Sequence, residues 1–147
     1  MNNNRVYLAQ TDTTVGFLSS DDKKLSAIKQ RCTSQKMLQV VDSFKTLKSK
    51  VRIPKKFRKL VRNSKNTTFI YPNSFSYRVV DSKSTHHNFI KKFKVLYSTS
   101  ANITKNKFDN NYAINNCDIS IEDSQGYFES TPSHIYKINK TKVHQIR

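Results

Sequence analysis

The chain has 147 residues, enough for one domain with a buried core. Its 27 lysines and arginines against 10 aspartates and glutamates give a formal net charge of +17, which indicates a polyanionic partner: nucleic acid, a nucleotide or an anionic membrane. The alternative explanation of the charge is mutational bias in an AT-rich coding sequence, which raises the pI without selection for a ligand. The 20 lysines against 7 arginines and the 14 asparagines are typical of such a bias. With Gly16 and Gly126 as its only glycines, the chain excludes a Walker loop and a dinucleotide-binding fingerprint.

The apolar runs and the cysteines indicate where in the cell the protein is expected. No apolar run approaches the roughly 20 residues that cross a bilayer, and the N-terminus, Met1–Arg5, lacks the apolar core of a signal peptide. Cys32 and Cys117 have neither a zinc-binding nor a redox spacing. We therefore expect a cytoplasmic protein with reduced thiols and without a membrane partner.

Periodic apolar positions predict strands alternating with helices, the pattern of an α/β layer structure. In chain order, the first half predicts a strand at Arg5–Gln10, a polar loop at Thr11–Gly16, a helix that Ser20 and Asp21 can cap and that has Lys29–Arg31 near its end, a strand at Lys36–Asp42, helical spacing over Phe44–Val51 and a helix beginning at Pro54. The second half predicts strands at Thr67–Tyr71 and Phe75–Val80, a helix at His86–Lys92, a strand at Lys94–Ser98, a loop at Thr104–Asn116 and short strands at Cys117–Ile121, Ile135–Ile138 and Val143–Ile146.

One stretch of the chain is basic and free of acids. Ser43–Val80 holds eleven lysines or arginines and no aspartate or glutamate. On the helix that begins at Pro54, we expect five cations to cover the face away from Phe57, Leu60 and Val61; they are Lys55, Lys56, Arg58, Lys59 and Arg62. This surface is interpreted either as a solvated helix exterior or as a sequence-independent RNA-binding surface that contacts phosphates.

Three polar clusters follow predicted strands or end a predicted helix: Thr11-Asp12-Thr13, Lys29-Gln30-Arg31 with Lys36 beyond it, and Ser100-Ala101-Asn102. Ligands of open α/β sheets bind beyond the carboxyl ends of strands, where the first and third clusters lie. Residues two apart diverge on a helix, so Lys29 and Arg31 can share a ligand only if the helix unwinds there. Lysine and arginine suit phosphate oxygens, and the polar neutral side chains suit a sugar or an amino acid. Taken singly, each cluster is also typical of a helix end or a turn.

Four further residues allow a chemical role. His86 and His87 are candidates for a metal or a base, but neighbours in sequence point apart, which favours surface or capping roles. Cys32 is a candidate nucleophile without a base nearby, which favours a packed thiol. Asp12 fits a base, a magnesium ligand or a loop-capping turn.

In their order, these clusters resemble the YrdC/TsaC family. Gln10–Phe17 is similar to the family's opening Pro-Thr-(Asp/Glu)-Thr-Val-Tyr-Gly-Leu, and Leu25–Arg31 with Lys36 is similar to its Lys-x-Arg segment and the lysine that follows. Ser98–Ile103 nearly repeats its Ser-Thr-Ser-Ala-Asn-Leu block, Thr131–Ile135 resembles its Pro-Ser-x-Ile stretch, and Arg147 matches an arginine that ends a strand. The family's Pro-Gly-Pro-Leu-Thr block appears as Ser64–Thr68, without its glycine.

The resemblance implies a single YrdC-like domain over residues 1–147, with an α/β (α+β) fold in which helices flank a twisted mixed β-sheet with a basic concave groove. It implies an enzyme, the nucleotidyltransferase L-threonylcarbamoyladenylate synthase. This activity joins L-threonine, bicarbonate and ATP and releases pyrophosphate. Its product serves tRNA threonylcarbamoyladenosine modification through a downstream threonylcarbamoyl transferase. The alternative is a catalytically weak or inactive module that binds double-stranded RNA or tRNA.

Position by position, the resemblance also assigns site residues. Those implied to bind ATP and threonine are Thr11, Lys29, Arg31, Lys36, Ser100, Asn102, Ser133 and Arg147. Among them, Lys29 and Arg31 would contact the phosphates and the substrate carboxylate, Ser100 and Asn102 would orient the reacting groups, and these four are the catalytic candidates. Thr11 would bind the threonine, and Ser133 with Arg147 would bind the nucleotide. ATP and Mg²⁺ are expected as a substrate complex, with no tightly bound cofactor and no metal site in the chain.

Overall fold

The computed structural model describes residues 4–147, so most of the Met1–Arg5 segment lies outside the described part. The strands found there are β1 (Tyr7–Gln10), β2 (Val15–Ser19), β3 (Gln39–Val41), β4 (Thr67–Ile70), β5 (Ser76–Val79), β6 (Val95–Ser100), β7 (Ile119–Ile121), β8 (His134–Ile138) and β9 (Val143–Gln145). The helices are α1 (Asp22–Lys29), α2 (Phe44–Lys50), the 3₁₀ turn η1 (Lys55–Phe57), α3 (Arg58–Asn63), α4 (Thr85–Ile90) and α5 (Asn110–Asn115).

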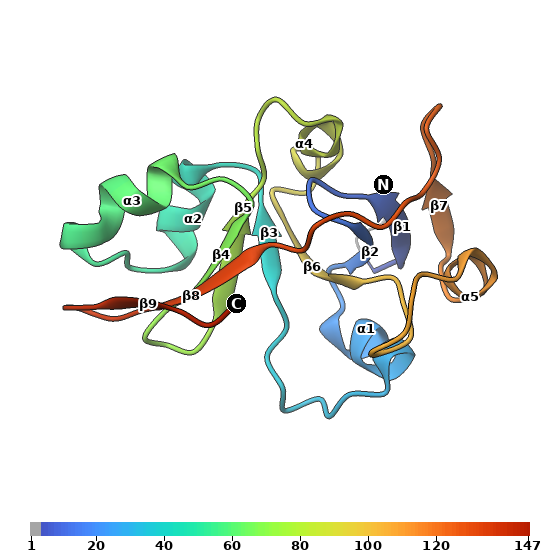
Figure 1. Cartoon of the computed structure of the whole chain (residues 1–147), viewed down its shortest axis with the longest axis horizontal. Helices are drawn as coiled ribbons and strands as arrows, with labels where there is room; N and C mark the ends of the chain where they lie inside the picture. Colours follow the sequence, from blue (N-terminus) through green and yellow to red (C-terminus); the bar gives the residue numbers. More distant parts are fainter. Residues whose placement is uncertain (1–3) are drawn as a thin grey trace.

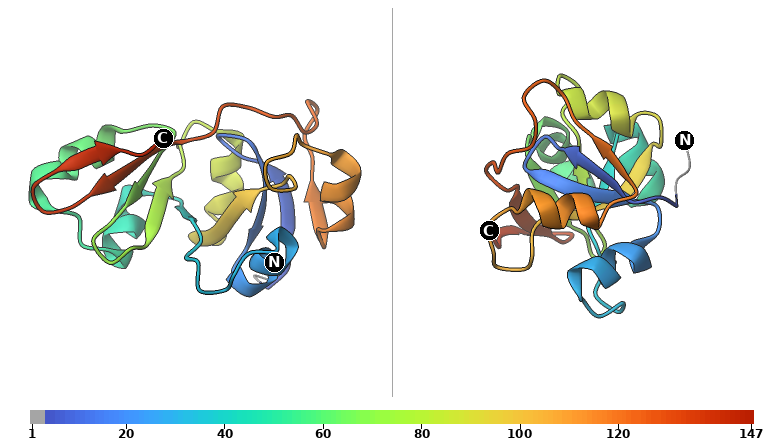
Figure 2. Two further views of the ribbon diagram at one scale, coloured as in Figure 1. Left: turned by 60° about the horizontal axis from the view of Figure 1, so that its bottom comes forward. Right: turned by 90° about the vertical axis from the view of Figure 1, so that its right-hand side faces the viewer.

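All these strands form one twisted sheet, in the order β7-β1-β2-β6-β3-β5-β4-β8-β9 (Figure 1). Three of its pairings, β1 with β7, β3 with β5 and β4 with β8, are parallel, and the others are antiparallel. Helices α2 and α3 lie toward one end of the sheet, and α1 and α5 lie toward the other (Figure 2). The predicted mixed α/β fold with flanking helices is confirmed.

Helix α1 follows its local signals. The side chain of Asp21 accepts hydrogen bonds from the backbone amides of Lys23 and Lys24, which caps the first turn. The helix ends at Lys29 because Gln30 takes a left-handed conformation with φ 53°. The chain therefore unwinds between Lys29 and Arg31, as the shared-ligand interpretation requires.

The predicted loops are wrong at two segments. Val15 and Gly16, predicted as loop, begin β2, and all five residues of this strand are buried, so no polar-apolar alternation marks it. Thr104–Asn116 contains α5, because Asp109 caps the amides of its first turn and Ala113 is fully buried. Strand β6 also continues through Ser100, so the Ser-x-Asn cluster starts on the strand itself.

Three side chains lie where the sequence does not predict them. His86 is 4% exposed and packs against Phe89, so a surface or capping role is wrong for it. Leu60 is 46% exposed, and the apolar side of α3 is carried by Val61. Cys32 is exposed in the turn after α1, so it is not the packed thiol expected. Both cysteines are free, and none of the helices between residues 4 and 147 has the length and apolar character to span a membrane.

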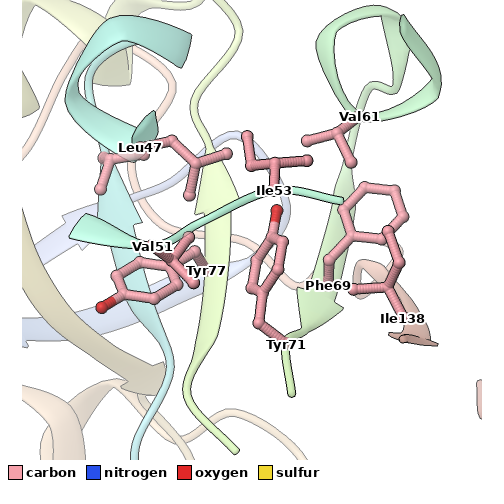
Figure 3. Close-up of a cluster of buried hydrophobic side chains, with 9 residues drawn as sticks. Leu47, Val51, Ile53, Val61, Phe69, Tyr71, Tyr77 and Ile138 are labelled. Atoms are coloured by element: carbon pink, nitrogen blue, oxygen red, sulfur yellow. The ribbon is translucent and has the colours of Figure 1, made fainter. Parts of the chain in front are cut away.

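The two faces of β4 and β5 have different surroundings. Phe69 and Tyr77 point into a core formed with Leu47 and Val61, the buried residues of α2 and α3 (Figure 3). Their neighbours in sequence point to the opposite face, where Thr68, Ile70, Ser76 and Arg78 line a cavity. The sheet therefore separates this cavity from α2 and α3.

Candidate functional site

A cavity of about 290 Å³ is the place where most of the predicted site residues meet. Its wall is built from the loop after β1, the segment after α1, the end of β6, strands β4 and β5, and the last segment of the chain. Six of the eight residues assigned to ATP and threonine line it, namely Thr11, Arg31, Lys36, Ser100, Ser133 and Arg147. These residues come from four separate segments, so the fold gathers them.

Asn102 lines a second cavity of about 220 Å³. The two cavities share Thr14, Ser100 and Pro132 in their walls, so they adjoin at the end of β6. The side-chain amide of Asn102 donates a hydrogen bond of 2.7 Å to the carbonyl oxygen of Asn106, which orients it. Ser100 thus lies at the junction between the two cavities.

Lys29 lies behind these walls and is 5% exposed. Its ammonium donates hydrogen bonds to the carbonyl oxygens of Ser100, at 3.0 Å, and of Asn102, and it lies 3.3 Å from Asn102 Oδ1. Burial, assisted by the charge of Arg31, lowers the pKa of Lys29 from 10.5 to about 8. The lysine therefore ties the end of α1 to the Ser100–Asn102 segment.

The loop after β1 is held by the hydroxyl of Thr11. This hydroxyl donates to the carbonyl oxygen of Thr14 at 2.5 Å and accepts from the amides of Thr13 and Thr14 at 3.1 and 3.2 Å. Gly16 follows, and a Cβ there would lie 3.0 Å from the carbonyl oxygen of Thr99 and 3.3 Å from Thr11 Cγ2. The glycine therefore allows the loop to approach β6 closely.

Sequence reasoning missed the role of Arg78. In the structure, its Nη2 lies 3.1 Å from Asp12 Oδ1, and the two side chains are 4% and 3% exposed. Asp12 was interpreted as a base, a magnesium ligand or a loop-capping residue. In the structure its carboxylate instead forms a buried ion pair with Arg78. An arginine between the apolar residues Tyr77 and Val79 of a predicted strand was the available signal for a buried, charged partner.

The last segment of the chain closes the cavity. Arg147 donates from Nε and Nη2 to the carbonyl oxygen of Ser133, at 3.2 and 2.9 Å. The hydroxyls of Ser133 and Thr68 lie 2.9 Å apart, which connects this segment to β4. Ser133 and Arg147, assigned to the nucleotide from separate motifs, are therefore in direct contact.

The electrostatics of the wall suit an anion. It contains four cations, Arg31, Lys36, Arg78 and Arg147, of which Arg78 is paired with Asp12, and it contains no aspartate or glutamate. Arg31 is exposed, whereas Lys36 donates to the carbonyl oxygen of Asn73 at 2.9 Å and lies over the ring of Phe75. Within residues 4–147 no group of three or more histidines, cysteines, aspartates or glutamates is placed to hold a metal ion.

No protein-family model and no curated protein matches the sequence. Solved structures match in fold. A double variant of Sua5 from P. abyssi has a TM-score of 0.78 at 12% identity, with 97% of this chain and 52% of that protein covered. P. abyssi Sua5 complexed with L-threonine has a TM-score of 0.77 at 13% identity, covering 97% and 50%. YciO from E. coli has a TM-score of 0.75 at 15% identity, covering 98% and 82%.

These similarities define the class of fold. The chain has the fold of the YrdC/Sua5-family domains, which confirms the fold that the resemblance implies. It spans about half the length of Sua5 and most of the length of YciO. At 12 to 15% identity the likeness concerns the fold alone.

Proposed function

We propose that the chain is an L-threonylcarbamoyladenylate synthase. The observation that carries the proposal is the gathering of six motif residues from separate segments around one cationic cavity. The fold supports it, because Sua5, which shares the fold, has been solved with L-threonine. The proposal includes the use of the adenylate product by a downstream transferase, which would transfer its threonylcarbamoyl group to tRNA.

The reaction needs positioning more than it needs a chemical group from the protein. The amine of threonine combines with bicarbonate and loses water to form a carbamate. A carbamate oxygen then attacks the α-phosphorus of ATP, a P–O bond forms, and the bond to pyrophosphate breaks with its electron pair leaving on pyrophosphate. Holding the two reactants in line and neutralising the phosphate charges lowers the barrier.

The geometry suggests a division of labour around the cavity. Arg31, exposed and on the wall, would neutralise the triphosphate, with Mg²⁺ entering as part of the ATP substrate. Ser133 and Arg147 would bind the nucleotide, and the loop of Thr11 would contact the threonine. Ser100, at the junction of the two cavities, would orient the reacting groups together with Asn102. Lys29 would act as a positioning residue, since its hydrogen bonds hold that segment.

The direct test is pyrophosphate release by the purified protein with MgATP, with threonine and bicarbonate added singly and together. Release that requires both co-substrates, with the adenylate identified by mass, is the expected result. Arg31→Gln should reduce the rate about 10- to 100-fold, because a hydrogen bond to a charged group contributes about 1.5–3 kcal/mol. The matched control, Arg52→Gln, changes an exposed arginine on the other side of the sheet and should leave the rate unchanged.

Two outcomes would contradict the proposal. Pyrophosphate release that is indifferent to threonine would indicate another nucleotide reaction. An absence of adenylate from folded protein, with RNA binding that survives Arg31→Gln, would instead favour the inactive RNA-binding module.

A further inference from the structure

A second cationic surface lies on the side of the sheet away from the cavity. It is formed by six exposed side chains of α2, η1, the start of α3 and the segment between them, and is called the basic face here: Lys48, Lys50, Arg52, Lys55, Lys56 and Arg58. The core of Figure 3 lies between these helices and the sheet. No cation of the basic face therefore reaches the cavity.

The basic face is hollowed. One hollow of about 330 Å³ is lined by Lys48, Lys50, Arg52 and Arg58. A larger one of about 580 Å³ is lined by Arg52, Lys55 and Lys56, with Lys140 from the turn between β8 and β9. Both walls include Val51 and Arg52, so the hollows adjoin there, and neither wall contains an acid.

The charges of this face are not neutralised within the protein. The ion pairs found among residues 4–147 are Lys65–Asp81, Arg78–Asp12 and Lys94–Asp42, and none involves the basic face. Like charges at close spacing repel one another, so an unpaired row of them is stabilised by an anion that carries charges in series. The phosphate backbone of nucleic acid is such an anion.

Two cations of this face are partly ordered by aromatic rings. Lys48 Nζ lies 5.7 Å from the ring centre of Phe44, and Lys56 Nζ lies 5.5 Å from that of Phe57. Both rings are half-buried, so they support the cations without offering an apolar surface of their own. This arrangement reduces the side-chain freedom that the cations would lose on binding.

We propose that the basic face binds the phosphate backbone of nucleic acid, independently of base sequence and of the cavity. A membrane surface is the competing partner, and the face fits it less well. Helices that bind membranes insert an apolar side, whereas α2 and α3 are seven and six residues long and Leu60 is the one large hydrophobic residue of this segment counted as exposed.

The test measures binding of fluorescein-labelled RNA and DNA duplexes by fluorescence anisotropy over a series of KCl concentrations, without ATP or threonine. The basic-face variant carries Lys50→Gln, Arg52→Gln, Lys55→Gln and Arg58→Gln. The control variant carries Lys23→Gln, Lys91→Gln, Lys92→Gln and Lys105→Gln, which remove the same charge from exposed positions on α1, after α4 and in the loop after β6. Thermal denaturation of both variants verifies that they are folded.

The wild type is expected to bind duplexes with a strong dependence on salt. The basic-face variant should lose about 100-fold or more in affinity at low salt, and its slope of log K against log salt should fall by about three to four, since each phosphate contact contributes about 0.9. The control should retain most of its affinity and its slope. Binding of RNA, of DNA or of both that is lost in the basic-face variant and kept in the control supports the proposal and identifies the nucleic acid; binding that the basic-face variant keeps contradicts it.

Three results would overturn the proposal. The first is no duplex binding by the folded wild type. The second is an equal loss of affinity in the control variant, which would reduce the effect to net charge. The third is salt-sensitive binding to phosphatidylserine vesicles, lost in the basic-face variant, without binding of duplexes, which would assign the face to a membrane. Because the assay contains no substrate, it succeeds or fails independently of the synthase.

Discussion

The buried ion pair between Asp12 and Arg78 offers the sharpest test of the site's construction. Asp12 belongs to the loop whose threonines line the cavity, and Arg78 reaches the same wall from β5. Asp12→Asn keeps the size of the side chain and removes its charge. The guanidinium of Arg78 then remains buried without a counter-charge, and we expect a large loss of stability.

The expected size of the loss follows from the burial of both partners. Their side chains are 4% and 3% exposed, so water can solvate little of the charge that is left unpaired. Removing one partner of such a pair costs about 3–5 kcal/mol, against a total stability of about 5–15 kcal/mol for a domain. At about 2–4 °C per kcal/mol, Asp12→Asn should lower the melting temperature by roughly 6–20 °C.

The assay is a double-mutant cycle followed by thermal and urea denaturation. Arg78→Met removes the positive charge, and the double variant with Asp12→Asn leaves neither charge buried. The double variant should be more stable than the sum of the two single effects predicts, by more than about 1 kcal/mol. If Asp12→Asn costs less than about 1 kcal/mol, or if the single effects simply add, the ion pair is not the support that we infer.

Three other perturbations test neighbouring parts of the structure. Burial lowers the pKa of His86 from 6.5 to about 4, so between these pH values the unfolded state binds a proton that the folded state does not. The free energy of unfolding should fall by about 3 kcal/mol as the pH falls through this range. In urea denaturation, the His86→Leu variant should not show this pH-dependent loss. Lys29→Met should lower both stability, by about 1–3 kcal/mol, and synthase rate, while the wild-type rate declines above pH about 8 as the ammonium loses its proton; a variant rate with the same decline would refute this. Gly16→Ala places a Cβ 3.0 Å from the carbonyl oxygen of Thr99 and should cost about 1–3 kcal/mol, so an unchanged melting temperature would contradict the close approach.

Short-range chemistry made much of this protein predictable from its sequence. The cap of Asp21 and the exit from α1 at Gln30 involve groups only a few residues apart, and both lie where the pattern predicts them. The alternation of polar and apolar residues in β5, from Ser76 to Val79, likewise marks a strand with two different faces. For the candidate site, residue type indicated the ligand: the cations of the wall suit an anion wherever they lie in the sequence.

Tertiary structure decided which remote groups touch. Lys29 was expected at the phosphates, yet its ammonium bonds the carbonyl oxygens of Ser100 and Asn102, which are 71 and 73 residues away. Asp12 finds Arg78 at a separation of 66 residues. Strand β2, buried along its whole length, has no alternation to reveal it, and α5 depends on the packing of Ala113.

The physical reason lies in the range of the interactions. Caps, turns and periodic burial are set by neighbours along the chain, so the sequence by itself determined most of the elements, though not β2 or α5, and the chemical character of the polar clusters. A lysine or an aspartate offers its charge to any partner, and only the pairing of β2 with β6, and of β3 with β5, determines which partner lies within reach. Strand pairing thus made one cavity from clusters that the sequence keeps apart.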